Sequence, residues 1–225
     1  QLYNTVDSIV VGNYVSKQAL AAVGSTGSLN FLINGFCMGL CSGFAIPIAQ
    51  AKGAKDDTEL RRFVMHSVYL CAIISVALGL ITGFGTPLLL DMLNTRDELM
   101  DKAVAYIQPV FFAIPATVLY NMASGILRSL GDGKTPLMAM VVASLVNIGL
   151  DLLFVVVFRW GVIGAAVATV IAQLVSCLFC ISRLRQLPMV HPSREDFRLT
   201  RAMAGKQMRL SLPIAAQNVI IAVGG

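Results

Sequence analysis

The sequence has little charge and few histidines. Of its 225 residues, 13% are charged, 56% are hydrophobic and two are histidine. Because so few charges cannot cover that much apolar side chain in water, the composition excludes a soluble globular protein. The mean hydropathy of +0.76 points the same way. We therefore expect an integral membrane protein.

The clusters that most enzymes and metal sites need are also missing. His66 and His191 are isolated, and the glycine turn at 131–133 is not a phosphate-binding loop. The cysteines lie in apolar runs without histidine or acidic neighbours, so we expect neither a structural metal site nor a disulfide framework. We accordingly expect no enzymatic activity and no organic cofactor. The five cysteines are Cys37, Cys41, Cys71, Cys177 and Cys180.

Long uncharged intervals separate the charged residues. Each is about 23 residues or longer, which suffices for a helix to cross a hydrocarbon core of roughly 30 Å. A transmembrane β-strand needs only about 10 residues, and lipid requires every backbone group to be satisfied internally, so we predict helices. The predicted spans are a partial span at 1–13, full spans at 20–49, 63–90, 103–127, 137–158 and 162–184, and the start of another at 210–225.

The basic residues predict the orientation in the membrane. If the first span runs outward, all but four of the 17 Lys and Arg residues fall on one side, which the positive-inside rule places in the cytoplasm. The net charge of +5 is thereby explained without a nucleic-acid partner. The four exceptions are Lys17, Arg96, Lys102 and Arg159.

One acidic residue lies inside a predicted span. From Leu137 to Phe158 only Asp151 is charged, and Asn147 lies one helical turn before it on the same face. A carboxylate in mid-membrane costs several kcal/mol at least, so it is expected to face a bundle interior or a wet cavity. Asp151 is therefore the first candidate functional residue.

Small and helix-breaking residues mark the remaining spans. Glycines repeat every fourth residue at Gly35, Gly39 and Gly43, a spacing that lets a neighbouring backbone approach closely. Pro109 and Pro115 are expected to kink the fourth span. Other polar side chains within spans are candidates for a substrate cleft, although packing explains them equally well. They are Asn30, Asn34 and Gln108.

Several of these segments resemble one known family. The segments are NTVDSIVVG at 4–12, ALAAVG at 19–24, AQAKGAKD at 49–56, GILRSLGD with TP at 125–136, NIGLD at 147–151 and GAAVAT at 164–169. In this order they resemble the multidrug and toxic compound extrusion (MATE) transporters. The resemblance implies twelve helices in two six-helix lobes that face a central cleft.

The resemblance implies that this chain is a piece of such a transporter. Residues 1–184 would be the amino-terminal lobe, residues 185–205 a cytoplasmic linker, and residues 206–225 the start of the seventh helix. The fold class would be an all-α polytopic membrane protein. We expect a monomer in the lipid bilayer, in the plasma membrane of a bacterium or archaeon, which is the inner membrane if the cell is Gram-negative.

The resemblance also implies a cation site. In the branch similar to DNA-damage-inducible protein F, its acids fall on Asp7 and Asp151, with other polar side chains around them. The sodium-coupled NorM branch has a further acid eight residues after a proline in the seventh helix, where this chain has Ile221, so the first branch is favoured. Leu152 stands where the family often has proline. The surrounding residues are Tyr106, Asn147 and Thr169.

Two carboxylates in one poorly solvated pocket repel, which makes a proton or a sodium ion a natural guest. The expected function is efflux of amphipathic or cationic compounds by antiport against H⁺ or Na⁺. One alternative is a flippase for lipid-linked oligosaccharides or polysaccharides, which belongs to the same superfamily. A membrane-embedded enzyme and a non-transporting scaffold are the alternatives from other classes.

Overall fold

The computed structural model describes residues 2–191, 196 and 200–224, and every regular element in this part of the chain is a helix. η1 is a π-helix and η2 a 3₁₀ turn. In chain order the elements are α1 (Leu2–Tyr14), α2 (Lys17–Ser25), α3 (Gly27–Gly53), α4 (Asp57–Phe84), α5 (Thr86–Met92), α6 (Asp97–Phe112), α7 (Ile114–Ser129), α8 (Lys134–Asp151), η1 (Leu152–Val157), α9 (Gly161–Leu184), η2 (Pro188–Val190) and α10 (Arg201–Gly224).

The helices have the length and surface of membrane spans. Within the described residues, four helical segments are long and apolar enough to cross a membrane, with α2 and α3 together forming one of them. The bent pair α6 and α7 makes a fifth candidate. Large apolar side chains such as Ile81 on α4 and Leu145 on α8 are exposed on the bundle surface. Such a surface suits lipid. The prediction of an all-α polytopic membrane protein is confirmed.

Two predicted spans are interrupted. The span expected at 63–90 ends at Phe84, because Gly85 begins a turn and Pro87 opens the separate short helix α5. The span expected at 20–49 divides at Thr26, whose hydroxyl donates to the Val23 carbonyl at 2.7 Å. Such back-bonding by hydroxyls commonly bends a helix.

The fourth span bends where its prolines predict. α6 and α7 meet at Ala113, between Pro109 and Pro115, and their axes differ by 47°. Proline supplies no N–H and its ring crowds the preceding turn, which explains a break at this place.

The fifth span changes its helical form directly after Asp151. α8 continues into the π-helix η1, so no proline is needed for the helix to depart from α geometry here. Single-turn π segments within α-helices occur often at functional sites. Leu152, which stands where the family often has proline, is thus the first residue of the irregular helix η1.

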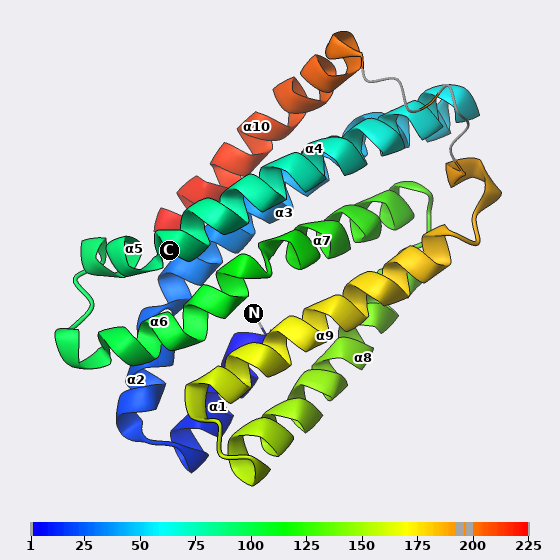
Figure 1. The fold of residues 1–225 in the computed structure, drawn as a ribbon. Helices are drawn as coiled ribbons and strands as arrows, with labels where there is room; N and C mark the ends of the chain where they lie inside the picture. Colours follow the sequence, from blue (N-terminus) through cyan, green and yellow to red (C-terminus); the bar gives the residue numbers. More distant parts are fainter. Residues whose placement is uncertain (1, 192–195, 197–199, 225) are drawn as a thin grey trace.

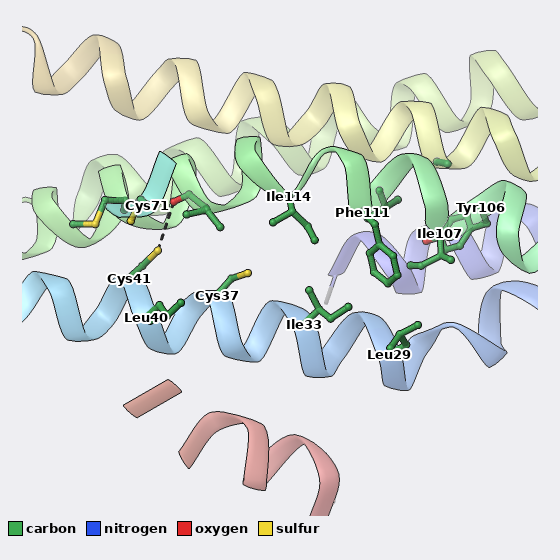
Figure 2. Packing of buried hydrophobic residues seen from close by; sticks show 14 of the residues in the cluster. Leu29, Ile33, Cys37, Leu40, Cys41, Cys71, Tyr106, Ile107, Phe111 and Ile114 are labelled. Carbon is green, nitrogen blue, oxygen red and sulfur yellow. Dashed lines mark hydrogen bonds between the residues drawn. The ribbon is translucent and has the colours of Figure 1, made fainter. Parts of the chain in front are cut away.

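α9 lies at the centre of one half of the bundle, where it packs against α6, α7 and α8, with α1 beside it (Figure 1). α3 packs against α4 and α7 in the other half. Figure 2 shows the apolar contact of α3 with α6 and α7, in which Leu29 and Ile33 of α3 face Phe111 of α6 and Ile114 of α7. All five cysteines are buried, and Cys41 donates to the Val118 carbonyl at 3.6 Å.

The glycine stripe of α3 receives the backbone of α10. A Cβ at Gly39 would lie 2.6 Å from the Ala215 Cα, and one at Gly43 would lie 2.2 Å from the Ser211 Cα. Both distances are far inside van der Waals contact. The close approach predicted from the spacing is confirmed, and the partner is the last helix of the chain.

The basic loops gather at one end of the bundle. Arg61 of α4 pairs with Asp196 at 3.2 Å, and Arg183 of α9 pairs with Asp132 at 3.3 Å. The junctions between α3 and α4, between α7 and α8, and after α9 all lie at this end (Figure 1). α10 begins at Arg201, earlier than residue 206, where the seventh helix was expected to start.

Candidate cation site and adjoining cavity

Asp7 is the centre of a buried polar cluster. Its side chain has 0% exposure, and its Oδ2 accepts hydrogen bonds from the Tyr106 hydroxyl at 2.7 Å and from the Thr169 hydroxyl at 2.8 Å. The Asn147 amide lies at the weaker distance of 3.4 Å from Asp7 Oδ1. α1, α6, α8 and α9 thus each contribute a polar side chain to this cluster.

Asp151 completes the cluster, but no described residue donates a hydrogen bond to it. Neither of its carboxyl oxygens accepts a hydrogen bond from an N–H or O–H group of the described chain, and the same holds for Asn147 Oδ1. The Asp151 carboxyl group instead neighbours that of Asp7. Both acids are fully buried. Two buried carboxylates in contact repel unless a proton or cation lies between them.

The local sequence explains how this cluster forms. Asn147 and Asp151 are four residues apart, so the last turn of α8 presents both on one face. Opposite them, α9 opens with small residues, and a Cβ at Gly164 would lie 3.1 Å from Phe154. The small side chains bring α9 close enough for Thr169 to reach Asp7. The five predicted cation-site residues, Asp7, Tyr106, Asn147, Asp151 and Thr169, all lie in this cluster.

The donor set fits a hard cation rather than a soft one. Carboxylate, carboxamide and hydroxyl oxygens surround the site, and such ligands suit Na⁺ or a proton. Within the described residues, no group of three or more His, Cys, Asp or Glu side chains could hold a metal ion. Asp7 and Asp151 with the Asn147 oxygen would be the groups that hold a sodium ion.

A cavity of about 870 Å³ adjoins the cluster. Its walls come from α1, α3, α7 and α9, and Ala222 of α10 closes one part. Thr169 belongs to both the cluster and the cavity wall, whereas the two acids do not line the cavity. This volume is that of a typical small-molecule site.

The predicted cleft residues divide between two places. Asn30 and Asn34 line the cavity, and the Asn34 amide donates to the carbonyl and side-chain oxygens of Asn30. Gln108 does not line it. Its side-chain amide donates to the Gly83 carbonyl at 2.9 Å, so Gln108 ties α6 to α4. An interior glutamine on a kinked helix is here a packing residue.

Other polar residues of the cavity were not predicted as site residues. Gln173 lies one turn after Thr169 on α9, and its amide oxygen accepts from the Thr117 hydroxyl of α7. The four-residue spacing from Thr169 was the available signal for Gln173. Thr117, Tyr120 and Asn121 gave no such signal, because only the fold brings α7 to the cavity.

Curated relatives resemble the chain over nearly its full length. It is 28% identical over 225 residues to the probable multidrug resistance protein YpnP of Bacillus subtilis, covering 99% of this chain and 50% of the relative. It is 27% identical over 189 residues to the DNA damage-inducible protein F of Escherichia coli, covering 83% and 40%. The chain thus spans about half the length of the curated relatives it matches.

A solved structure and a family comparison agree with these relatives. A multidrug resistance MATE transporter in its inward-facing conformation superposes with a TM-score of 0.91 at 28% identity, over 99% of this chain and 51% of that one. The family described as MatE matches residues 1–153, which include Asp7, Tyr106, Asn147 and Asp151. The chain belongs to the MatE family of membrane transporters.

Proposed function

We propose that the full-length protein exports amphipathic small molecules, including cationic ones, by antiport against H⁺ or Na⁺. The observation that carries the proposal is that the fully buried carboxyl groups of Asp7 and Asp151 are neighbours. In addition, both carboxyl oxygens of Asp151 and Oδ1 of Asn147 find no hydrogen-bond donor among the described residues. A cation at this place would relieve both the repulsion and the unpaired acceptors. In this proposal the protein acts as a transporter and not as an enzyme, because exchange of a solute for a cation requires no catalytic group.

Transport follows if the two lobe conformations bind the cation with different affinities. Residues 1–184 would form the amino-terminal lobe, residues 185–205 the linker, and residues 206–225 the beginning of the second lobe. Support for this division comes from the match to half of each relative. α10 would then bring the second lobe against the glycine stripe of α3.

The expected location is the plasma membrane of a bacterium or archaeon. The basic end of the bundle, which includes Arg61, Arg128 and Arg183, would face the cytoplasm. We expect a monomer, because each lobe would find its main contact surface on the other.

Gradient-driven efflux from vesicles tests the proposal. Full-length protein should export a fluorescent cationic dye under an imposed proton or sodium gradient, and Asp151→Asn should abolish the response to the coupling gradient. Gln108→Leu removes a polar side chain and its hydrogen bond to Gly83 outside the cavity and the cluster, so it is the control for the general loss of a buried polar contact in a span. Efflux with unchanged gradient dependence in Asp151→Asn would sink the coupling mechanism. Transport of a lipid-linked sugar without drug export would favour a flippase.

A further inference from the structure

Three aromatic rings gather where η1 ends and α9 begins. The Phe154 ring stacks on that of Trp160, with ring centroids 5.0 Å apart and ring planes inclined by 17°. The Phe158 ring lies 6.0 Å from the Phe154 ring and 5.7 Å from the Trp160 ring. The Trp160 backbone N–H also donates to the Phe154 carbonyl at 2.9 Å. These contacts tie the end of η1 to the start of α9.

A glycine of α9 packs against the same residue of η1. A Cβ at Gly164 would lie 3.1 Å from the backbone carbonyl carbon of Phe154 and 3.2 Å from its oxygen, so the two backbones are in close contact. Thr169, which donates to Asp7, lies further along the same helix. α9 therefore holds η1 at one place and contacts the cation site at another.

The buried face of α8 and η1 explains what the π turn does. Buried residues recur at every fourth position across the junction, and in an α-helix each such step advances about 40° around the axis. An uninterrupted α-helix would therefore turn this face steadily away from its neighbours. The Phe158 N–H donates to the Leu153 carbonyl at 2.9 Å, and this i→i+5 bond adds one residue to the turn, which rotates the face back. The buried positions are Ala139, Ala143, Asn147, Asp151 and Val155.

We propose that Phe154 and Trp160 are positioning residues that act through Asp151. Their stack holds the extra residue of η1 in place, and η1 keeps the Asp151 carboxyl group beside that of Asp7. Because the end of η1 is held on α9, loss of the extra residue would rotate α8 by about 100° relative to α9. Asp151 would then leave the buried cluster. This inference rests on the proposed function, since it assigns the geometry of the cation site to residues outside that site.

The cation dependence of efflux separates positioning from stability alone. The cation concentration that gives half-maximal dye efflux from vesicles is measured for full-length wild type and variants, as a pH profile for H⁺ and as a concentration series for Na⁺. Trp160→Ala should raise this concentration roughly two- to tenfold, the factor that corresponds to the loss of one aromatic pair. Trp160→Phe keeps a ring beside Phe154 and should restore most of the wild-type dependence.

A second ring pair supplies the matched control. The Phe84 and Phe112 rings lie 5.3 Å apart in an edge-to-face arrangement between α4 and α6, and neither residue belongs to η1 or to the cation site. Phe84→Ala should lower the thermal midpoint much as Trp160→Ala does, but it should leave the half-maximal cation concentration at the wild-type value.

Deletion of Val157 removes the extra residue itself. The variant should regain a continuous α-helix with a rotated α8, and its efflux should no longer respond to the coupling gradient. Its thermal midpoint in detergent establishes that it is folded. Should the deletion variant not fold, Trp160→Ala and Trp160→Phe decide the question.

The outcomes separate this inference from the proposed function. If Trp160→Ala lowered the thermal midpoint but kept the wild-type cation dependence, the rings would be structural only, and the inference would be overturned while efflux stood. An equal shift in Phe84→Ala, or a folded Val157 deletion with wild-type cation dependence, would also overturn it. If folded wild-type protein exported no dye under either gradient, the proposed function itself would fail.

Discussion

Thr169 donates a hydrogen bond of 2.8 Å to Asp7 and also lines the cavity of about 870 Å³. Thr169 therefore contacts both the proposed cation site and the adjoining cavity. A cation bound to Asp7 would take the place of the hydroxyl hydrogen that Thr169 donates. The Thr169 hydroxyl at the cavity wall would then rotate or be released. Ligand and cation can influence one another through this residue if the hydroxyl takes different positions in the two states.

Thr169→Val should weaken the coupling between the cation at Asp7 and a ligand in the cavity. The packing should stay intact, since valine has nearly the same shape as threonine. Loss of one buried hydrogen bond to a charged group corresponds to about 1.5–3 kcal/mol, or roughly 10–150-fold in apparent cation affinity. Gradient-driven transport measured against proton or sodium concentration would show the shift. Thr169→Ser retains the hydroxyl and should behave almost as wild type. Equal cation dependence in the valine variant would exclude the role.

Gly43→Ala should separate α3 from α10. Its added Cβ would lie 2.2 Å from the Ser211 Cα, so one backbone must move. Overpacking of this kind costs about 1–3 kcal/mol, which should lower the thermal midpoint of the full-length protein in detergent. Gly24→Ala is the matched control, because among the described residues outside its own helical turn no atom lies within 4 Å of its added Cβ. A midpoint for Gly43→Ala equal to that control would contradict the close contact.

His66→Phe should loosen the start of α10. His66 is buried, its Nδ1 bonds the Arg62 carbonyl at 2.7 Å, and its Nε2 accepts from the Thr200 N–H at 2.9 Å. Phenylalanine removes that acceptor, at a cost of about 1 kcal/mol or more. Amide hydrogen exchange at Thr200 should rise several-fold. His66→Gln supplies another acceptor and should restore part of the protection, whereas unchanged exchange in the phenylalanine variant would refute the contact.

Asp132→Asn should lower thermal stability at neutral pH and not at low pH. The Thr135 backbone N–H, then its hydroxyl and Arg183, hold the pKa of Asp132 below its ordinary value of 3.8. The ionised form is therefore favoured by folding. Its contribution is complete above pH 3.8 and disappears as the pH falls through the lower folded pKa.

Thermal midpoints of both proteins across this pH range give the test. The two curves should differ at pH 7 and converge as the pH falls through the lowered folded pKa of Asp132. Because Asp132 is only partly buried and its partner Arg183 is half-exposed, solvent screening keeps the difference small. A constant difference across the whole range would show that the carboxylate charge has no part in it.

The helices and one of the acids could be predicted from the sequence for a simple reason. Charge-free runs are imposed by the membrane, and an acid within such a run, Asp151, is costly enough to signal function. Asp7 lies near the start of the chain in a short segment, and its role was implied only by resemblance. The burial of Asp7 and its contact with Tyr106 follow from the packing of four helices.

The remaining contacts depend on long-range packing. The sequence does not show that Gln108 turns towards Gly83 or that Thr117 reaches Gln173, because both contacts join helices whose separation in space is set by the whole bundle. The π-helix after Asp151 also lacked a signal. Glycine spacing on α3 predicted a close neighbour but could not name α10 as that neighbour.

The central proposal is that Asp7 and Asp151 hold an exchangeable cation, and antiport requires that binding of substrate lowers the affinity for that cation. Proton release from purified full-length protein in weakly buffered detergent, on addition of a transported drug, measures this directly for H⁺; displacement of ²²Na⁺ measures it for sodium. We predict about one cation released per drug bound in wild-type protein and none in Asp151→Asn, with Gln108→Leu behaving as wild type. Drug binding to wild-type protein without release of either cation would contradict the account.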